Sequence, residues 1–459
     1  MKWRKATAMS LAGVMAASVM SVGGVSTVFA ADGVKYTDIK LGEDTDTKAD
    51  IKMLTNRTDM LDSDYSGKSW DAYLKEFNEM YPDIKVEIEG VTDYAQDSLL
   101  RLQGGDWGDI MMIPEVDKSD LSTYFLSYGD LDSVKEEVKY PNRWLYENEV
   151  YGIPITVVGR GVLYNKKVFE EAGITELPKT PDEFITDLKA VKDKTDAIPL
   201  YTNYAAGWTM GAWDDYTGIT ATGDAKYRNQ EFAHTENPFS DPGDGTGAYN
   251  VYKVLYDAVA GGLTEDDYST TDWESSKGML NNGQIATMVL GSWAYPQMQG
   301  AGDNADDIGY FAFPITVDGK QYSPADEDYC FGINANSDAD NQKAAMIFVK
   351  WMTEKSGYSY NEGGLPIAVG DDELPDVYKE FTDNNVEFIS NEPALEGEED
   401  VLNELNADSE LMVGAGGNEK IQAIVEHASN GDESFDDIMN EWNEKWSDAQ
   451  DADGVEVNK

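Results

Sequence analysis

The 459-residue chain carries 87 Asp and Glu residues against 35 Lys and Arg residues, which gives a formal net charge of −52. Hydrophobic residues make up 41% of the chain, enough to bury the cores of two or three domains, so a disordered chain is excluded. So acidic a surface repels phosphate backbones and anionic headgroups, which argues against nucleic-acid binding and against membrane docking through a basic face. One cysteine and two distant histidines provide no disulfide and no zinc-ligand spacing. We therefore expect no metal site and no cofactor.

The first 30 residues have the pattern of a signal peptide. Lys2, Arg4 and Lys5 precede an apolar and small-residue stretch, and Val28 and Ala30 stand at positions −3 and −1 of a cut before residue 31. We expect a secreted protein, located in the periplasm or at the extracellular face of the cell envelope. A retained membrane anchor is the alternative, which the Ser and Gly content of the stretch weakens. No lipid-attachment Cys is seen near this segment.

After this segment, short apolar runs alternate with helical patterns. Strands are expected at residues 51–55, 84–88 and 110–113, and helices fill the two intervals between them. This βαβαβ order favours a mainly parallel sheet with helices on both faces, whose ligand site lies beyond the carboxyl ends of the strands. The order returns with helices at 181–191 and 248–260 and strands at 198–201 and 285–290. The sequence therefore predicts an α/β fold with two doubly wound lobes.

Enzymatic motifs are weak in this chain. Residues 357–361 miss the nucleophile elbow of serine hydrolases, because Asn361 stands where a glycine is needed. With 87 acidic residues, spacing alone neither identifies nor rejects a glycosidase pair. No catalytic residue is therefore assigned.

A series of ordered segments covers most of the mature chain. They are residues 151–155 (YGIPI), 162–174 (VLYNKKVFEEAGI), 178–184 (PKTPDEF), 283–294 (GQIATMVLGSWA), 309–314 (GYFAFP), 329–333 (YCFGI), 343–352 (KAAMIFVKWM), 363–366 (GGLP) and 434–442 (SFDDIMNEW). In this order behind a signal peptide, they resemble the extracellular solute-binding proteins of ABC sugar importers, the maltose-binding-protein-like family. The resemblance implies a periplasmic-binding-protein-like fold. It also implies a monomer, without enzymatic activity, that captures a carbohydrate, most simply an oligosaccharide, by hinge closure and delivers it to the permease of an ABC transporter.

The resemblance also implies where the lobes are joined. Crossing segments are expected near residues 157–161, 318–326 and 365–370. The first lobe would then hold residues 32–157 plus 327–368, and the second lobe residues 158–326 plus 369–459. Val158 and Gly159 stand where some relatives carry an acidic residue in the cleft, so Arg160 either substitutes for that residue or belongs to a buried ion pair.

A sugar ring needs an aromatic side chain for its apolar face and polar partners for its hydroxyl groups. Trp293 matches the stacking position of the family, and a core Trp at the start of a helix is the alternative; Tyr295 follows closely. Trp208 and Trp213 follow the strand at 198–201, and we expect Trp208 to face the cleft and Trp213 to be in the core.

Polar ligand-binding residues are expected where strands meet the edge of the sheet. The candidates are Arg57 and Asp59 after the first strand, Glu115 after the third, and Asp328 before the strand at 329–333. A solvated loop is the alternative for the first two. A function of a different class, a secreted glycan-active enzyme or a surface glycan-adhesion module, remains open.

Overall fold

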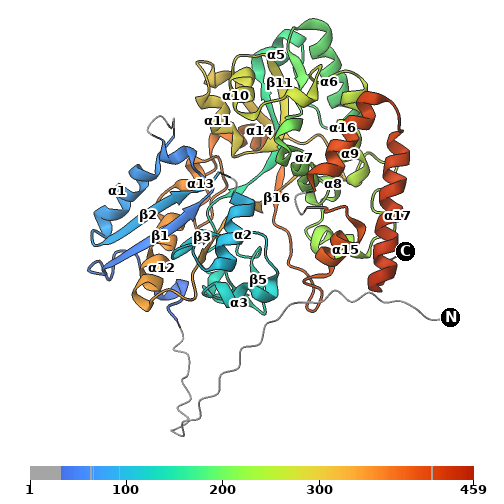
Figure 1. The fold of residues 1–459 in the computed structure, drawn as a ribbon. Helices are drawn as coiled ribbons and strands as arrows, with labels where there is room; N and C mark the ends of the chain where they lie inside the picture. Colours follow the sequence, from blue (N-terminus) through green and yellow to red (C-terminus); the bar gives the residue numbers. More distant parts are fainter. Residues whose placement is uncertain (1–32, 63–64, 66, 93, 415–416, 459) are drawn as a thin grey trace, which may run out of the picture. The chain divides into compact units, whose positions relative to one another are not determined.

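The computed structural model describes residues 33–458 except 63–64, 66, 93 and 415–416. The predicted signal peptide at residues 1–30 lies outside the described residues. The unit Val34–Lys459 contains two main sheets with helices packed against them (Figure 1). None of the helices in the described ranges combines the length and the apolar character that crossing a bilayer requires.

The first sheet has five strands. In spatial order they are β2 (Ile84–Gly90), β1 (Ala49–Thr55), β3 (Ile110–Met112), β15 (Cys330–Ile333) and β7 (Ile153–Pro154). β1 pairs in parallel with both β2 and β3, as the βαβαβ pattern predicts. β15 is antiparallel to β3 and to β7, and it comes from a part of the chain far beyond the other strands.

Helices that are distant in the sequence complete this lobe. They are α1 (Trp70–Met80), α2 (Tyr94–Gly104), α12 (Ala339–Glu354) and the short α13 (Tyr358–Asn361). The side chain of Ser69 caps α1, whose Trp70, Tyr73 and Phe77 are buried at the three- and four-residue spacing of a helix face. α12, orange in Figure 1, packs against the blue β1. Smaller elements lie beside them: α3 (Leu121–Tyr124), α4 (Leu131–Val134), and the sheet of β4 (Gly129–Asp130), β6 (Glu149–Val150) and β5 (Leu145–Tyr146).

The second sheet has four strands. In spatial order they are β10 (Ile198–Leu200), β11 (Ile285–Gly291), β9 (Arg160–Asn165) and β12 (Ile308–Ala312). Only β10 and β11 are parallel, because β9 runs antiparallel to both of its neighbours. The expectation of mainly parallel pairing is therefore wrong for this sheet. An apolar run predicts that a strand is buried but not its direction, and β9 follows directly from a crossing segment rather than from a βαβ unit.

Both faces of the second sheet are buried. Along β9, Val162 and Tyr164 belong to one hydrophobic cluster, whereas Leu163 belongs to the cluster that is shared with the first sheet. Its strands contact α5 (Lys166–Ala172), α6 (Pro181–Lys194), α10 (Trp273–Asn281), α11 (Ala294–Gly300) and α14 (Lys379–Asp383). The other helices of this part of the chain are α7 (Trp208–Gly211), α8 (Ile219–Thr222), α9 (Gly247–Ala260), α15 (Val401–Ser409), α16 (Asn418–Asn430) and α17 (Phe435–Asp453). This arrangement explains the near-continuous apolar runs in β9 and β11.

Three segments run side by side between the two main sheets. β8 (Val157–Val158) pairs with β14 (Asp326–Glu327), and Val157 also bridges to Leu365. These contacts lie where the three crossings were expected, while the lobe boundaries themselves stay a prediction. A further pair joins β13 (Tyr322–Pro324) to β16 (Glu387–Ile389).

Candidate functional site

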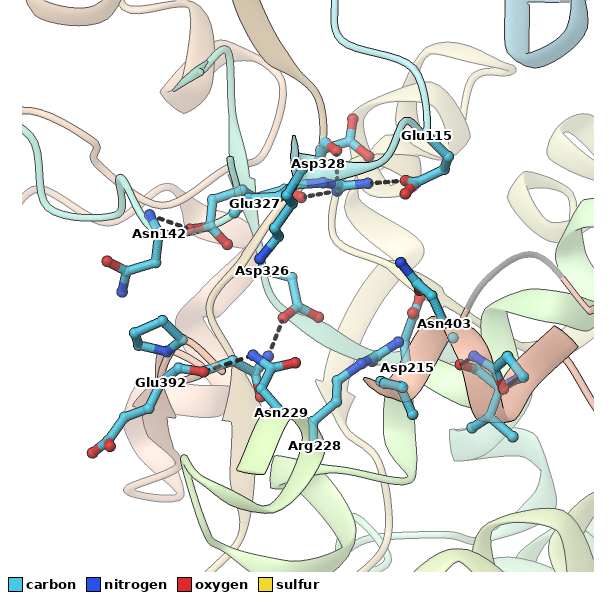
Figure 2. A pocket seen from close by; sticks show the side chains of 18 of the residues that line it. Glu115, Asn142, Asp215, Arg228, Asn229, Asp326, Glu327, Asp328, Glu392 and Asn403 are labelled. Atoms are coloured by element: carbon cyan, nitrogen blue, oxygen red, sulfur yellow. Dashed lines mark hydrogen bonds and ion pairs between the residues drawn. The ribbon is translucent and has the colours of Figure 1, made fainter. Parts of the chain in front are cut away.

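A cavity of about 430 Å³ lies where the edges of the two main sheets meet the crossing strands. Its volume is within the range of small-molecule sites. Glu115, which follows β3, and Asp328, which precedes β15, line it together with Glu327 of β14. Its other wall is formed by residues that include Asp215, Arg228, Asn229, Glu392 and Asn403 (Figure 2). Because cations and carboxylates alternate around this space, we call it the charged cavity.

Arg160, the first residue of β9, holds the centre of the charged cavity. Its Nη2 lies 3.1 Å from Oδ2 of Asp215, and its Nε lies 3.4 Å from Oδ2 of Asp326 in β14. Burial alone would lower the pKa of Arg160, but the two carboxylates raise it above its ordinary value. Of the two roles expected for Arg160, a substitute for the cleft acid or a member of a buried ion pair, the structure therefore supports the second. Its guanidinium joins a crossing strand to the binding cavity.

Arg143 organises the opposite side. Its Nη1 donates hydrogen bonds to the backbone oxygens of Glu327 and Asp328, both at 2.6 Å, and its Nη2 donates to Oε1 of Glu115 at 2.6 Å. Burial raises the pKa of Asp328, and the positive charges of Arg160 and Arg143 oppose that shift. Two of the predicted ligand-binding acids, Glu115 and Asp328, therefore line one cavity and share one arginine.

Glu327 has the most unusual titration in this cavity. Burial raises its pKa to about 7, and the nearby negative charge of Asp326 acts in the same direction. Its Oε1 accepts a hydrogen bond from the backbone nitrogen of Asn142 at 3.3 Å. This carboxyl changes charge near neutral pH.

Three tryptophans contact one another beside the charged cavity. The ring centroids are 5.2 Å apart for Trp208 and Trp273, 5.6 Å for Trp208 and Trp293, and 5.7 Å for Trp273 and Trp293, with interplanar angles of 51 to 82°. Because the rings are inclined to one another, they form an aromatic corner rather than a flat wall. Nζ of Lys277 lies 4.9 Å from the ring of Trp273.

The aromatic corner adjoins the charged cavity through Gly291. A Cβ atom at this position would lie 2.7 Å from Nε1 of Trp293 and 3.0 Å from Nη1 of Arg160. The indole and the guanidinium therefore both contact the same glycine at the end of β11.

Known proteins resemble this chain in both sequence and structure. A family model described as "bacterial extracellular solute-binding protein" matches residues 62–358. The chain belongs to this family.

Solved members of the solute-binding proteins cover almost all of the chain. A manno-oligosaccharide-specific solute-binding protein from Bifidobacterium animalis subsp. lactis, solved with mannotriose, is 56% identical, covers 92% of this chain and 99% of its own, and has a TM-score of 0.88. A binding protein of an ABC transporter from the same organism, solved with mannobiose, is 53% identical over the same shares, with a TM-score of 0.89. The multiple sugar-binding protein of Streptococcus mutans is 27% identical over 311 residues, 64% of this chain and 71% of its own.

The predicted aromatic residues of this solute-binding protein fall into two groups. Trp208 is 41% exposed and belongs to the aromatic corner, whereas Trp213 is 2% exposed and packs edge-on against Phe313. Trp293 is half-buried and immediately precedes α11. Tyr295 accepts a hydrogen bond from Gln299, and burial raises its pKa to about 12. Tyr295 is not among the residues that line the charged cavity.

Arg57 and Asp59 lie together but outside the charged cavity. Arg57 donates to both carboxylate oxygens of Asp59, at 2.9 and 2.8 Å, and to Glu362 at 2.8 Å. The hydroxyl groups of Tyr65 and Tyr358 accept its remaining donors. All five N–H groups of this guanidinium therefore have partners within the protein. Their role as ligand-binding residues stays a prediction.

Several residues of the site were not anticipated from the sequence, Trp273 and Arg228 among them. Trp273 begins α10 directly after the capping residue Asp272, so an aromatic side chain at a capped helix start was the available signal. Arg228 lies in a π-helix (Tyr227–Glu231) within a polar stretch without apolar periodicity, where no sequence signal exists. In the ranges that the structure describes, no group of three or more His, Cys, Asp or Glu side chains is arranged to hold a metal ion.

Proposed function

We propose that this solute-binding protein captures a manno-oligosaccharide outside the cytoplasm and delivers it to the permease of an ABC importer. The observation that carries the proposal is the aromatic corner, placed next to a cavity in which carboxylates and guanidinium groups alternate. The two Bifidobacterium proteins with 56% and 53% identity, solved with mannotriose and mannobiose, support this ligand class.

The two regions fit the two kinds of surface that a sugar presents. Indole faces remove the apolar face of a pyranose from water, and we assign this role to Trp293 and Trp208. Hydroxyl groups must keep hydrogen-bond partners once buried, and we assign that role to Asp328 and Glu115. Arg143 bonds one carboxylate oxygen of Glu115 and only the backbone oxygen of Asp328, so Oε2 of Glu115 and the carboxylate of Asp328 are available to accept bonds from the ligand.

Hinge closure is the second part of the proposal. β8, β14 and the segment around Leu365 are the three strands on which the lobes would turn, with lobe boundaries at 157/158, 326/327 and 368/369. Closure would reduce the radius of gyration in X-ray scattering at saturating ligand. An unchanged radius, with binding established by calorimetry, would contradict this part of the proposal.

We also propose that the protein acts as a monomer in the periplasm or at the extracellular face of the envelope, without a lipid anchor and without turnover of its ligand. A mass equal to that of one chain, both with and without ligand, would support the monomer. Incubation with mannotriose followed by an assay for new reducing ends tests for turnover. Any product release would favour the secreted glycan-active enzyme instead.

The central test is calorimetric titration with mannobiose, mannotriose, maltotriose and raffinose. We expect tight binding of the two manno-oligosaccharides and weak or no binding of the other two. A thermal-shift series provides the same ranking, because a ligand that binds only the folded state raises its stability by mass action. Preference for a non-mannose sugar would refute the ligand class while leaving the family unchanged.

A further inference from the structure

A π-helix shapes one wall of the charged cavity. Residues Tyr227–Glu231 adopt this rare conformation, which recurs at functional sites in proteins. Nδ2 of Asn229 donates to the backbone oxygen of Glu392 at 2.6 Å, and Nε2 of Gln230 donates to that of Pro393 at 2.8 Å. Both acceptors belong to the segment that lines the cavity. The π-helix is therefore held in place from the cavity side, and the direction of Arg228 is determined with it.

The side chain of Arg228 lies directly against the backbone of Gly414. A Cβ atom at Gly414 would lie 1.8 Å from Nη2 of Arg228, and Gly414 has a φ of +68°, so this position accommodates glycine alone without displacement. The backbone nitrogen of Gly414 donates to Oδ2 of Asp214 at 2.8 Å, and Lys420 pairs with the same carboxylate. A buried ion pair thus holds the surface on which the guanidinium rests.

The guanidinium of Arg228 makes no hydrogen bond or ion pair within the ranges that the structure describes, in contrast to Arg57, Arg143 and Arg160. It lines the charged cavity and extends toward Asp215 (Figure 2). Burial raises the pKa of Asp215, and the charges of Arg160 and then Arg228 oppose that shift. Asp215 itself is already paired with Arg160. The N–H groups of Arg228 therefore lie on the side of the cavity where the carboxylate of Asp215 is also found, and they point into the cavity.

We propose that Arg228 is a specificity-determining residue, which donates hydrogen bonds to hydroxyl oxygens of the bound sugar while Asp215 accepts from the same group of hydroxyls. A planar guanidinium presents two parallel N–H groups, which match two neighbouring oxygens of a sugar ring and distinguish their configuration. The inference rests on the proposed function, since the ligand is taken to be a manno-oligosaccharide. Beyond that function, the inference names Arg228 as the residue that distinguishes sugars by the configuration of their hydroxyl groups.

The test compares R228A, R228K and R228Q by calorimetric titration with mannobiose and mannotriose. Loss of charge-assisted hydrogen bonds is expected to weaken binding by R228A about 10- to 100-fold. R228K retains the charge but not the planar fork, so it should recover only part of the affinity. R101A is the matched control, because Arg101 pairs with Glu89 away from the charged cavity. Denaturant midpoints of all variants separate a binding defect from a folding defect.

A second measurement uses mono-deoxy derivatives of mannobiose. In the wild type, removal of the hydroxyl that contacts Arg228 should weaken binding, whereas R228Q and R228K should show a reduced penalty for that same derivative. Equal penalties for every derivative in all proteins would overturn the inference, as would affinity within twofold of wild type in R228A. Full recovery in R228K would also overturn it, because Arg228 would then only compensate the charge of Asp215. If the wild type binds no manno-oligosaccharide at all, the proposed function fails instead.

Discussion

The aromatic corner and the charged cavity are neighbours of opposite chemistry. In the corner, Trp208, Trp273 and Trp293 pack against one another at inclined angles, and Trp208 keeps 41% of its surface exposed. In the cavity, Arg160 is already paired with Asp215 and Asp326. Exposed apolar surface contributes to affinity in proportion to the area that a ligand covers. Charges that are already paired add little net affinity, but they select ligands whose polar groups fit the existing arrangement of donors and acceptors. We therefore expect affinity to come chiefly from the corner and selectivity from the cavity.

The largest expected effect concerns the support of the charged cavity. Lys420→Met would leave the fully buried Asp214 with only Tyr252 and the backbone of Gly414 as partners. Removing one partner of a buried pair costs about 3–5 kcal/mol of stability. Denaturant unfolding measures this loss. The matched control is Lys445→Met, which breaks an exposed pair with Glu441 and should cost less than about 0.5 kcal/mol. Similar small losses in both variants would mean that buried charges do not stabilise this wall.

The next largest effect tests the corner. If a sugar covers about 100 Å² of Trp293, the contact contributes at most about 2.5 kcal/mol, or roughly 70-fold in affinity. Trp293→Ala should therefore weaken calorimetric binding between tenfold and a hundredfold with a small change in denaturant midpoint. Trp213→Ala is the control. Truncation of this buried side chain should lower the stability of the protein by about 3–5 kcal/mol, while the fraction that remains folded binds the sugar normally. Near wild-type affinity for Trp293→Ala would remove this residue from the site.

A smaller effect depends on pH. The folded state keeps a proton on Glu327 up to pH about 7, whereas the unfolded chain releases it near the ordinary value of 4.5. Between these pH values the folded state binds more protons than the unfolded chain, so the contribution of Glu327 to the free energy of unfolding falls as the pH rises. Glu327→Gln should remove a penalty of about 1–2 kcal/mol above pH 7, after allowance for partial exposure, and almost none below pH 4.5. Unfolding midpoints at several pH values measure the gain; Glu274→Gln, at an exposed pair, should show none.

The smallest effect distinguishes the members of the corner. Trp208→Ala should weaken binding only about three- to tenfold if the sugar covers about 25–55 Å² of this ring, less than the area assumed for Trp293. Leu100→Ala, which alters another exposed apolar side chain far along α2, is the control and should leave affinity unchanged. A loss that equals that of Trp293→Ala would place both rings in equal contact with the ligand.

Much of the fold was predictable because buried apolar residues recur in the sequence at the spacing of a helix or a strand. A helix was expected between the strands at 51–55 and 84–88 and another at 181–191, and α1 and α6 lie there. Strand direction left no such trace, which is why antiparallel β9 was not anticipated. Glu115 and Asp328 were each expected at a strand end, and the antiparallel pairing of β3 with β15 places both beside the charged cavity.

The rest of the site depends on long-range packing. Arg228 reaches the cavity only because a π-helix is held by the segment around Glu392, and neither feature has a local signature. Trp273 joins the corner through helix packing rather than through proximity in the sequence. The partners of Arg57 also come from distant parts of the chain, since Glu362 and the hydroxyl of Tyr358 accept hydrogen bonds from its guanidinium.

The order of strands along the chain also affects how this protein is made. β3 obtains its antiparallel neighbour β15 only when residues 330–333 have left the ribosome, long after β1, β2 and β3 themselves. Until then the edge of β3 is unpaired, and such edges recruit other chains. Pairing across so long a separation is also slow. The nascent protein thus cannot finish its first sheet before the second half is synthesised, which keeps the chain incompletely folded for most of its synthesis. A fragment that ends before β15 should aggregate, whereas the complete chain refolds.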